Sequence, residues 1–449
     1  MKRFKKEENM RKGVILSMVA ALSLGLLAGC SGGSSSKTSK EAASKDDVKV
    51  WVQFSDETAE GKAWEQVVQN FNKKYKGKYK VVTEYIPRSG SGGGYEDKVN
   101  AAITTNSLPD VITLDGPNTA AYAKSKVITL LDDYLKDNNM EDVLDSIKQQ
   151  GTYDGKFYAF GYSESNVGIY YNKKMFKEAG IDESSLPTLK KPWTWDEFKA
   201  VSKKLKDHFK EAAIDFRLNS NDEMLPYAYM PLIWSNGGSV VNEDGTKAEG
   251  YFNSKESTQA VQFIQDLVKE GYTTVSPVEK GFETGQYPMV LSGSWTIADL
   301  QTNYKDIDFG ILPYPVSNKT KKLVSPSGSW QLAVTTKSNK KDAAAEFVKF
   351  ATNTESSEIL SLGNSVLPIR KSTIENIKDK VSEPMRFLME QNAATAHARP
   401  VVVAYPQVSR SFQQAMQDIS YYEENPDVQK VLDSRAKEMQ TAIDDSLKK

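Results

Sequence analysis

The sequence predicts an α/β protein built as two lobes, and three observations lead to that prediction. Short apolar stretches typical of strands alternate with amphipathic stretches of helical period, a pattern that favours largely parallel sheets covered by helices. The chain has one cysteine, so it forms no internal disulfide and depends on its core for stability. Its 449 residues suit about two or three domains of ordinary size, and we expect two lobes.

A basic segment and an apolar run open the chain. Lysines and arginines gather within residues 2–12, and residues 14–27 are apolar or small, which is the pattern of a secretory signal. The run is shorter than the about 20 apolar residues that a membrane span needs. We therefore expect residues 1–29 to be a signal peptide.

The single cysteine follows this run directly, in the stretch Leu27-Ala28-Gly29-Cys30. The stretch resembles the lipobox of bacterial lipoproteins, in which the cysteine carries a lipid such as palmitate and becomes the new N-terminus. We expect lipidation at Cys30 and a flexible spacer over residues 30–46, which lack aromatic residues and are rich in Ser, Gly and Lys. An ordinary signal followed by a stray thiol is the alternative.

Charge and hydropathy argue against binding to nucleic acid and against a second membrane-spanning segment. The whole chain has formal charge −1 and the leader is basic, so the remainder is mildly acidic, which argues against nucleic acid as a partner. No later stretch approaches about 18 continuous apolar residues, so membrane attachment would depend on the lipid at Cys30.

Strand and helix patterns then follow in order from residue 48. The glycine-rich loop Ser89–Gly94 lacks the Gly-Lys-Ser/Thr ending of a phosphate-binding loop and is expected to be a plain turn. Thr194 and Glu197 have the spacing of a capping box and predict the start of a helix. From about Glu355 the pattern is mostly helical. The expected strands are Val48–Phe54, Tyr79–Ile86, Val111–Leu114, Val167–Tyr171, Met289–Ser292, Phe309–Leu312 and Trp330–Thr335. The expected helices include Tyr95–Thr105, one opened by Asn253 and closed by Gly271, and Asp342–Ala351.

The residues offer little material for metal, cofactor or triad chemistry. His208 and His397 are the only histidines, and neither lies in a Gly-x-Ser-x-Gly turn or near a cysteine. The stretch Asp137-Asn138-Asn139 lacks the glycine and terminal glutamate of a calcium loop. We expect no cofactor, no metal and no catalytic residue. Glycoside hydrolysis needs only two carboxyl groups, so a surface-anchored glycoside hydrolase remains the alternative.

Aromatic residues lie next to Gly, Ser and Asn at the ends of predicted strands. In open α/β sheets such positions face the ligand crevice, and a sugar suits this wall because its C–H faces stack on aromatic rings while its hydroxyls need donors and acceptors. Core packing is the alternative for each ring. The motifs are Gly293-Ser294-Trp295, Gly328-Ser329-Trp330, Trp51 and Phe54 before Ser55-Asp56, and Trp234 before Ser235-Asn236-Gly237-Gly238.

From Val48 to about Ile443 the sequence resembles the extracellular solute-binding proteins of ATP-driven sugar importers, family 1, the maltose-binding-protein-like group. The motifs that carry the resemblance, in order, are Leu108-Pro109-Asp110-Val111, Tyr170-Tyr171-Asn172-Lys173, Thr194-Trp195-Asp196-Glu197-Phe198, Pro231-Leu232, Gly237-Gly238, Gly293-Ser294-Trp295 and the segment Ser338–Phe350.

This resemblance implies a two-lobe periplasmic-binding-protein-like fold of type II with the ligand cleft between the lobes. The family's order would place residues 47–157 plus 306–363 in lobe 1 and residues 158–305 plus 364–449 in lobe 2. It implies a monomeric binding protein, not an enzyme, whose partners are a carbohydrate, most simply an oligosaccharide, and ABC permease subunits in the membrane. With the lipobox, it implies a lipid-anchored protein on the extracellular face of the cytoplasmic membrane of a Gram-positive bacterium.

Carried over by position, the resemblance also implies the ligand-binding residues. Trp295, Tyr227 and Phe412 match stacking aromatics of the family. The strand before Asp115 ends in Leu114 where maltose-binding protein has a tryptophan, so the resemblance implies a sugar without naming it. The expected ligand-binding residues are Phe54, Ser55, Asp56, Glu96, Asp115, Asn118, Glu164, Ser165, Asn166, Tyr227, Trp295, Gly328, Ser329, Trp330, Arg399 and Phe412.

Overall fold

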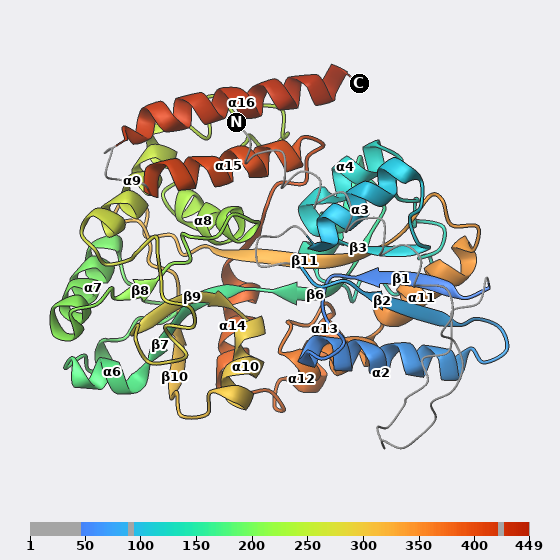
Figure 1. Ribbon diagram of the computed structural model, residues 1–449, viewed down its shortest axis with the longest axis horizontal. Helices are drawn as coiled ribbons and strands as arrows, with labels where there is room; N and C mark the ends of the chain where they lie inside the picture. Colours follow the sequence, from blue (N-terminus) through green and yellow to red (C-terminus); the bar gives the residue numbers. More distant parts are fainter. Residues whose placement is uncertain (1–45, 89–93, 421–425, 449) are drawn as a thin grey trace, which may run out of the picture. The chain divides into compact units, whose positions relative to one another are not determined.

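The computed structural model describes residues 46–88, 94–420 and 426–448, which belong to one compact unit, Lys45–Lys449 (Figure 1). The predicted signal peptide, Cys30 and the rest of the spacer up to residue 45 lie outside these ranges, as do residues 89–93 of the glycine-rich loop. None of the helices within the ranges combines the length and apolar character that a bilayer crossing demands.

The first sheet has the strand order β12-β11-β3-β1-β2, with β6 also paired to β11. Helices α3 and α4 cover one face, and α2, α11 and α12 cover the other. The strands are β1 (Val48–Val52), β2 (Val81–Tyr85), β3 (Val111–Asp115), β6 (Phe160–Ser165), β11 (Ser325–Val334) and β12 (Ala396–Ala398). The helices around them are α2 (Ala59–Lys74), α3 (Gly94–Thr105), α4 (Thr119–Lys124), α5 (Asp145–Gly151), α11 (Lys341–Ala351), α12 (Thr354–Asn364) and α13 (Lys371–Ile377).

The second sheet has the order β10-β7-β9-β8. Its strands are β7 (Val167–Asn172), β8 (Ile214–Asp215), β9 (Met289–Gly293) and β10 (Phe309–Leu312). Its helices are α6 (Lys173–Glu178), α7 (Trp195–Phe209), α8 (Met224–Ser235), α9 (Lys255–Lys269), α10 (Trp295–Asn303), α14 (Glu383–Thr395), α15 (Tyr405–Ser420) and α16 (Val428–Lys448). A hairpin, β4 (Thr152–Tyr153) and β5 (Lys156–Phe157), and two 3-10 turns, Gly116–Asn118 and Glu183–Ser185, complete the described elements.

The local patterns predicted strands β1, β2, β3, β7, β9, β10 and β11 and helices α3, α7, α9 and α11, but not β6, β8 or α8. The capping box is present, because Thr194 Oγ1 accepts from the Glu197 amide while Glu197 accepts from the Thr194 amide. Helix α9 begins one residue later than expected, since Ser254 rather than Asn253 caps it. Strand β11 is longer than the expected Trp330–Thr335, because its first half pairs with β12 and β6.

The expectation of largely parallel sheets is wrong. Strands β1, β2 and β3 pair in parallel, but β11 runs antiparallel to both β3 and β6, and β7 runs antiparallel to β9 and β10. Hydrophobic period reports which faces of a strand are buried and carries no information on strand direction. Both sheets are therefore mixed.

The chain passes between the two sheets at Asn166, which separates β6 in the first sheet from β7 in the second. Asn166 Nδ2 donates to the Pro326 carbonyl at 2.7 Å and to Ser325 Oγ at 2.9 Å, which ties this crossing to the start of β11. Two expected boundaries need correction on this ground. Strand β6 lies in the first sheet although it follows residue 158, and β10 lies in the second although it follows residue 306. The rest of the lobe division stays a prediction.

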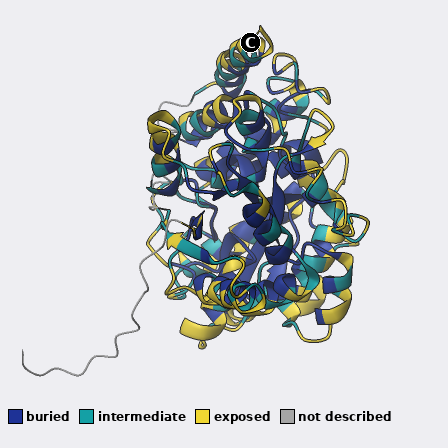
Figure 2. Ribbon diagram, turned by 90° about the vertical axis from the view of Figure 1, so that its right-hand side faces the viewer, coloured by how far each residue is buried: buried dark blue, intermediate teal, exposed yellow. Residues whose placement is uncertain are grey.

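Large apolar clusters fill the space between each sheet and its helices. One cluster joins β1 with α2, α11 and α12, a second joins the other face of β1 and β3 with α3, and a third joins β7 and β9 with α8, α9, α15 and α16. Figure 2 shows the buried residues concentrated inside and the exposed ones on outer helix faces and loops. Such cores stabilise the fold without disulfides.

Candidate functional site

A cavity of about 460 Å³ lies where residues from both sheets converge. A second cavity of about 260 Å³ adjoins it, because Arg88, Asp115, Asp222, Glu223 and Trp330 line both. We call the two cavities together the cleft. The first sheet and its loops contribute Gln53, Phe54, Arg88, Asp115, Ser163, Glu164, Ser165, Gly328 and Trp330 to the larger cavity, and the second sheet and α8 contribute Ser292, Ser294, Trp295, Met224 and Tyr227.

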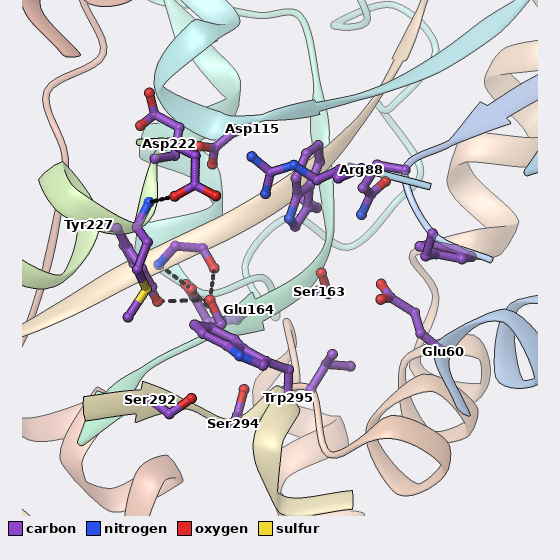
Figure 3. Close-up of a pocket in the computed structure, with 18 of the residues that line it drawn as sticks. Glu60, Arg88, Asp115, Ser163, Glu164, Asp222, Tyr227, Ser292, Ser294 and Trp295 are labelled. Carbon is purple, nitrogen blue, oxygen red and sulfur yellow. Dashed lines mark hydrogen bonds between the residues drawn. The ribbon is translucent and has the colours of Figure 1, made fainter. Parts of the chain in front are cut away.

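Two aromatic rings form one wall of the larger cavity (Figure 3). The rings of Tyr227 and Trp295 lie 6.4 Å apart at 35°, and Trp295 is 42% exposed, which is unusual for a tryptophan. A Cβ on Gly293 would lie 2.1 Å from the Trp295 ring, and a Cβ on Gly328 would lie 2.5 Å from the Tyr227 ring. Both glycines are therefore required because an aromatic ring rests on the backbone there.

Trp330 forms part of the facing wall, where it lines both cavities. The Arg88 guanidinium lies 5.3 Å from the centre of the Trp330 ring and pairs with Glu96 at 2.9 Å. Tyr95 packs edge-on against the same indole, with the ring centres 6.4 Å apart. A cation held over an aromatic face and paired with a carboxylate is fixed in place, so this wall is pre-organised.

Arg399 connects the two sides of the cleft. It donates to Asp115, at the end of β3, at 2.7 Å, and to Glu223, before α8, at 2.6 Å. Its guanidinium also lies 4.9 Å from the centre of the Tyr227 ring. Tyr405 donates to Glu223 at 2.7 Å. Burial raises the pKa of Glu223, and the charge of Arg399 opposes that shift. Because Arg399 is 4% exposed, it acts mainly by holding these carboxylates and the tyrosine ring in place.

Glu164 is fully buried beside the cavity and has all of its acceptor positions engaged. Its Oε1 accepts from the amides of Ser165 and Gly328, both at 2.9 Å. Its Oε2 accepts from the hydroxyls of Ser146 at 2.8 Å and Ser327 at 2.9 Å. Burial raises the pKa of Glu164, and these hydrogen bonds oppose the shift. The carboxylate therefore joins three chain segments and has no acceptor position left for a solute.

Glu60 differs from Glu164, although it lines the same cavity. Tyr162 donates to its Oε1 at 3.3 Å, and burial raises the pKa of Glu60 to about 7 while that hydrogen bond opposes the shift. A carboxylate can accept about four hydrogen bonds. Glu60 therefore keeps acceptor capacity that faces the cavity.

Eleven of the expected ligand-binding residues line the cleft. They come from sequence positions between 54 and 399, and folding brings them together at one place. They are Phe54, Glu96, Asp115, Asn118, Glu164, Ser165, Tyr227, Trp295, Gly328, Trp330 and Arg399.

Five expected residues do not line it. Phe412 is fully buried in the core, with its ring 5.4 Å from that of Phe252, because the inward face of α15 is apolar. Asn166 and Ser329 are buried among hydrogen bonds that join β6, β11 and α5. Ser55 turns toward α2, where its carbonyl accepts from Thr58 Oγ1 at 2.7 Å, and Asp56 is exposed outside both cavities.

Several cleft residues carried no distinguishing signal in the sequence. Glu60 lies in a helix where an acidic first turn is ordinary, and Arg88 is one of many basic residues in loops. Ser294 lay in the Gly293-Ser294-Trp295 motif, which could have drawn attention to it. The cleft residues that sequence reasoning missed include Gln53, Glu60, Arg88, Ser163, Arg217, Asp222, Glu223, Ser292, Ser294 and Asn364.

The histidines and acidic residues of the described ranges form no cluster of three or more that could hold a metal ion. The His397 ring stacks on Trp234 with the ring centres 4.1 Å apart, and His208 packs against Phe209. Neither histidine lines the cleft. The arrangement in the cleft is thus one of aromatic faces and hydrogen-bonding groups.

Comparisons with known proteins agree with this geometry. The family model of the bacterial extracellular solute-binding proteins matches residues 55–358. The diacetylchitobiose-binding protein DasA of Streptomyces coelicolor is 25% identical over 389 residues, which cover 82% of this chain and 84% of DasA. The cyclic α-maltosyl-1,6-maltose-binding protein of Arthrobacter globiformis superimposes with a TM-score of 0.75 at 25% identity, covering 89% of this chain and 99% of that one.

A further solved structure has the same fold at lower identity. The ABC substrate-binding protein Lmo0181 of Listeria monocytogenes, in complex with cycloalternan, aligns with a TM-score of 0.74 at 23% identity over 88% of this chain and 98% of that one. The family model covers well over half of the sequence, and the fold and the cleft accord with it. The chain belongs to the family of bacterial extracellular solute-binding proteins.

Proposed function

We propose that this protein captures an extracellular carbohydrate, an oligosaccharide, in the cleft and delivers it to the membrane permease of an ABC transporter. The observation that carries the proposal is the wall formed by Tyr227 and Trp295, because a tryptophan that is 42% exposed inside a cavity is available for stacking on a sugar ring. Relatives whose names or structures specify diacetylchitobiose, cyclic maltosyl-maltose and cycloalternan support the choice of an oligosaccharide.

The groups facing that wall suit a neutral, hydroxyl-rich solute. Asp222, Glu60 and Ser294 line the cavity with hydrogen-bonding side chains, and Trp330 adds a third aromatic ring. Charge-assisted hydrogen bonds from sugar hydroxyls to carboxylates are roughly twice as strong as neutral ones. Stacking and hydrogen bonding together would bind the sugar without making or breaking a bond.

Binding at a site built from both sheets would also stabilise one arrangement of the two lobes. A permease that recognises that arrangement would distinguish loaded from empty protein. We propose that the protein acts as a monomer, held at the outer face of the cytoplasmic membrane by a lipid on Cys30 after removal of residues 1–29. The bacterium would be Gram-positive, and the spacer would keep the binding protein near its transporter at high effective concentration.

A thermal-shift screen over mono- to tetrasaccharides, followed by calorimetry on the best candidates, tests the binding role. A sugar present at about 100 times its dissociation constant should stabilise the fold by about 2.7 kcal/mol. If no carbohydrate shifts the unfolding temperature, the carbohydrate assignment fails. New reducing ends after incubation with oligosaccharides would instead indicate a glycoside hydrolase.

Membrane fractionation of the full-length chain and of Cys30→Ala tests the anchor. The wild-type protein should be found in the membrane fraction, and Cys30→Ala should be released while keeping its sugar affinity. A variant that stays in the membrane fraction would contradict the anchor.

A further inference from the structure

Glu60 occupies an unusual position in the larger cavity. It belongs to the first turn of α2, and Figure 3 shows its carboxylate extending into the pocket near Ser163, across from Asp222 and Tyr227. The position was not expected from the sequence, and the residue has no part in the core clusters around α2.

A chain of buried hydrogen bonds ends at this carboxylate. Thr113 Oγ1 donates to Gln53 Oε1 at 2.7 Å. Gln53 Nε2 donates to the Tyr162 hydroxyl at 2.7 Å, and that hydroxyl donates to Glu60 Oε1 at 3.3 Å. Thr113, Gln53 and Tyr162 are all at least nine-tenths buried. Each group therefore orients the next, and the final donor fixes one oxygen of Glu60 while leaving acceptor capacity on the carboxylate for the cavity.

No cation compensates Glu60 among the described residues. Arg88 pairs with Glu96, and Arg399 pairs with Asp115 and Glu223. Among the titratable groups on elements packed against α2, Tyr85 donates to Glu65, Glu346 accepts from Tyr75, and Glu358 accepts from Asn376. The charged and titratable groups that share its cavity are Arg88, Asp115, Glu164, Arg217, Asp222, Glu223, Tyr227 and Arg399.

We propose that Glu60 is a specificity residue of the cleft: as a carboxylate it accepts a hydrogen bond from a hydroxyl or a protonated amine of the sugar, and it rejects sugars that are anionic at that position. The inference rests on the proposed function, because it names the chemistry by which one cleft residue selects the carbohydrate. Ser294, on the opposite side of the cavity, supports a polar ligand, since its Oγ is buried and has no partner within the described residues.

The same arrangement makes binding depend on pH. Burial raises the pKa of Glu60 to about 7, so the carboxylate is partly protonated at neutral pH. A ligand that donates to the ionised form stabilises that form, releases a proton on binding, and binds more tightly as the pH rises through 7. Substitution by glutamine removes the titration while keeping the size of the side chain.

Calorimetry at pH 6.0, 7.0 and 8.0 tests the proposal, with the tightest neutral binder among malto-, cello- and chito-oligosaccharides as the probe. The wild-type dissociation constant should fall at least fivefold from pH 6 to pH 8. Glu60→Gln should bind with less than a twofold change over that range. Glu57→Gln is the matched control, because it removes the same charge from an exposed position nearby, and it should retain the wild-type dependence.

The second probe is the same oligosaccharide with its primary hydroxyls oxidised to carboxylates. At pH 8 the wild type should bind it at least tenfold more weakly than the neutral sugar, and Glu60→Gln should narrow that difference. Two results with the neutral sugar would overturn the role of Glu60 while leaving the carbohydrate receptor intact. In the first, Glu60→Gln keeps the pH dependence of the wild-type affinity. In the second, the wild-type affinity falls as the pH rises. If no sugar binds at any pH, the proposed function fails together with this one.

Discussion

Glu164 and the Tyr227–Trp295 wall adjoin the same cavity, yet the structure uses them in opposite ways. Around Glu164, strands β6 and β11 meet the segment at Leu367, and every acceptor position of the carboxylate is taken by a donor from the chain. At the wall, the Trp295 indole is 42% exposed and rests on Gly293. A polar group saturated by its own chain holds the architecture, whereas an exposed ring or unsatisfied oxygen is available to a ligand.

Glu164 also lies close to the point where the chain crosses between the two sheets, and its hydrogen bonds connect the segments that meet at this crossing. The backbone of Glu164 exchanges two hydrogen bonds with Leu367, at 3.0 and 2.8 Å, in addition to the four that its side chain accepts. This places one residue in contact with three segments where the chain passes between the sheets. At the wall, Tyr227 is itself held, because it is buried and its hydroxyl bonds to Ser165 Oγ at 2.8 Å. Of the two rings, the more exposed Trp295 is therefore the one that can change with little effect on the fold.

The largest expected effect is on stability, from Glu164→Ala. Four donors, two of them buried, would lose their acceptor at once, which should lower the free energy of unfolding by about 3 kcal/mol. Urea denaturation followed by circular dichroism measures it. Glu57→Ala, an exposed change, should stay within about 0.5 kcal/mol of wild type. A loss below about 1 kcal/mol for Glu164→Ala would mean that the hydrogen bonds of Glu164 are not important for stability.

Trp295→Ala should show the reverse behaviour. Because the indole is 42% exposed, the free energy of unfolding should fall by no more than about 1 kcal/mol, while sugar affinity should fall by about 2 kcal/mol, as for the loss of a stacking anchor. Calorimetry with the sugar found in the screen measures the affinity, and denaturation measures the stability. Unchanged affinity would remove Trp295 from the binding site.

Gly293→Ala should move the Trp295 ring without deleting it. Gly293 does not have a positive φ, so alanine fits the backbone, but its Cβ would lie 2.1 Å from the indole and push the ring outward. We expect sugar affinity to fall about tenfold, which is about 1.4 kcal/mol, and tryptophan fluorescence to change. Gly250→Ala, where a Cβ would meet nothing but φ is positive, controls for backbone strain alone.

The smallest expected effect concerns Glu60 and stability in the absence of ligand. Its pKa is about 7 in the folded protein and near 4.5 when unfolded, so between these values the folded state holds the extra proton and stability falls as pH rises. Glu60→Gln should therefore be more stable than wild type at pH 8 and nearly equal to it near pH 4.5. We expect a difference of about 1 kcal/mol at pH 8, less than the pKa shift alone would give, because the side chain is only partly buried and solvent screens its charge. Denaturation curves at both pH values measure it. Equal stability at pH 8 would mean that Glu60 titrates as an ordinary exposed acid.

Local signals in the sequence predicted seven of the strands and several of the helices, but not β6, β8 or α8. The capping box at Thr194 and Glu197 depends on neighbours three residues apart, and the strands β1, β3 and β9 depend on short, mostly apolar stretches. Both are properties of short segments, so they survive in any tertiary setting. Strand direction is not such a property, which is why the mixed character of both sheets went unpredicted.

Part of the site could be predicted because two sequence motifs contain glycines that contact an aromatic ring of the cleft. Gly293-Ser294-Trp295 and Gly328-Ser329-Trp330 contain the glycines on which aromatic rings lie, and Trp295 and Trp330 line the cleft as expected. Phe412 shows the limit, since a position expected to stack on a sugar proved to be the buried face of α15.

The α/β class, the bounds of most of the expected elements to within a few residues, and the aromatic motifs of the cleft were thus available from the sequence alone. Only the tertiary structure decided which carboxylates are available to a ligand. Glu164 is saturated by donors at positions 146, 165, 327 and 328, whereas Glu60 has one donor at position 162. Most of these partners are distant in the chain, and no local pattern records whether a buried charge will find its donors.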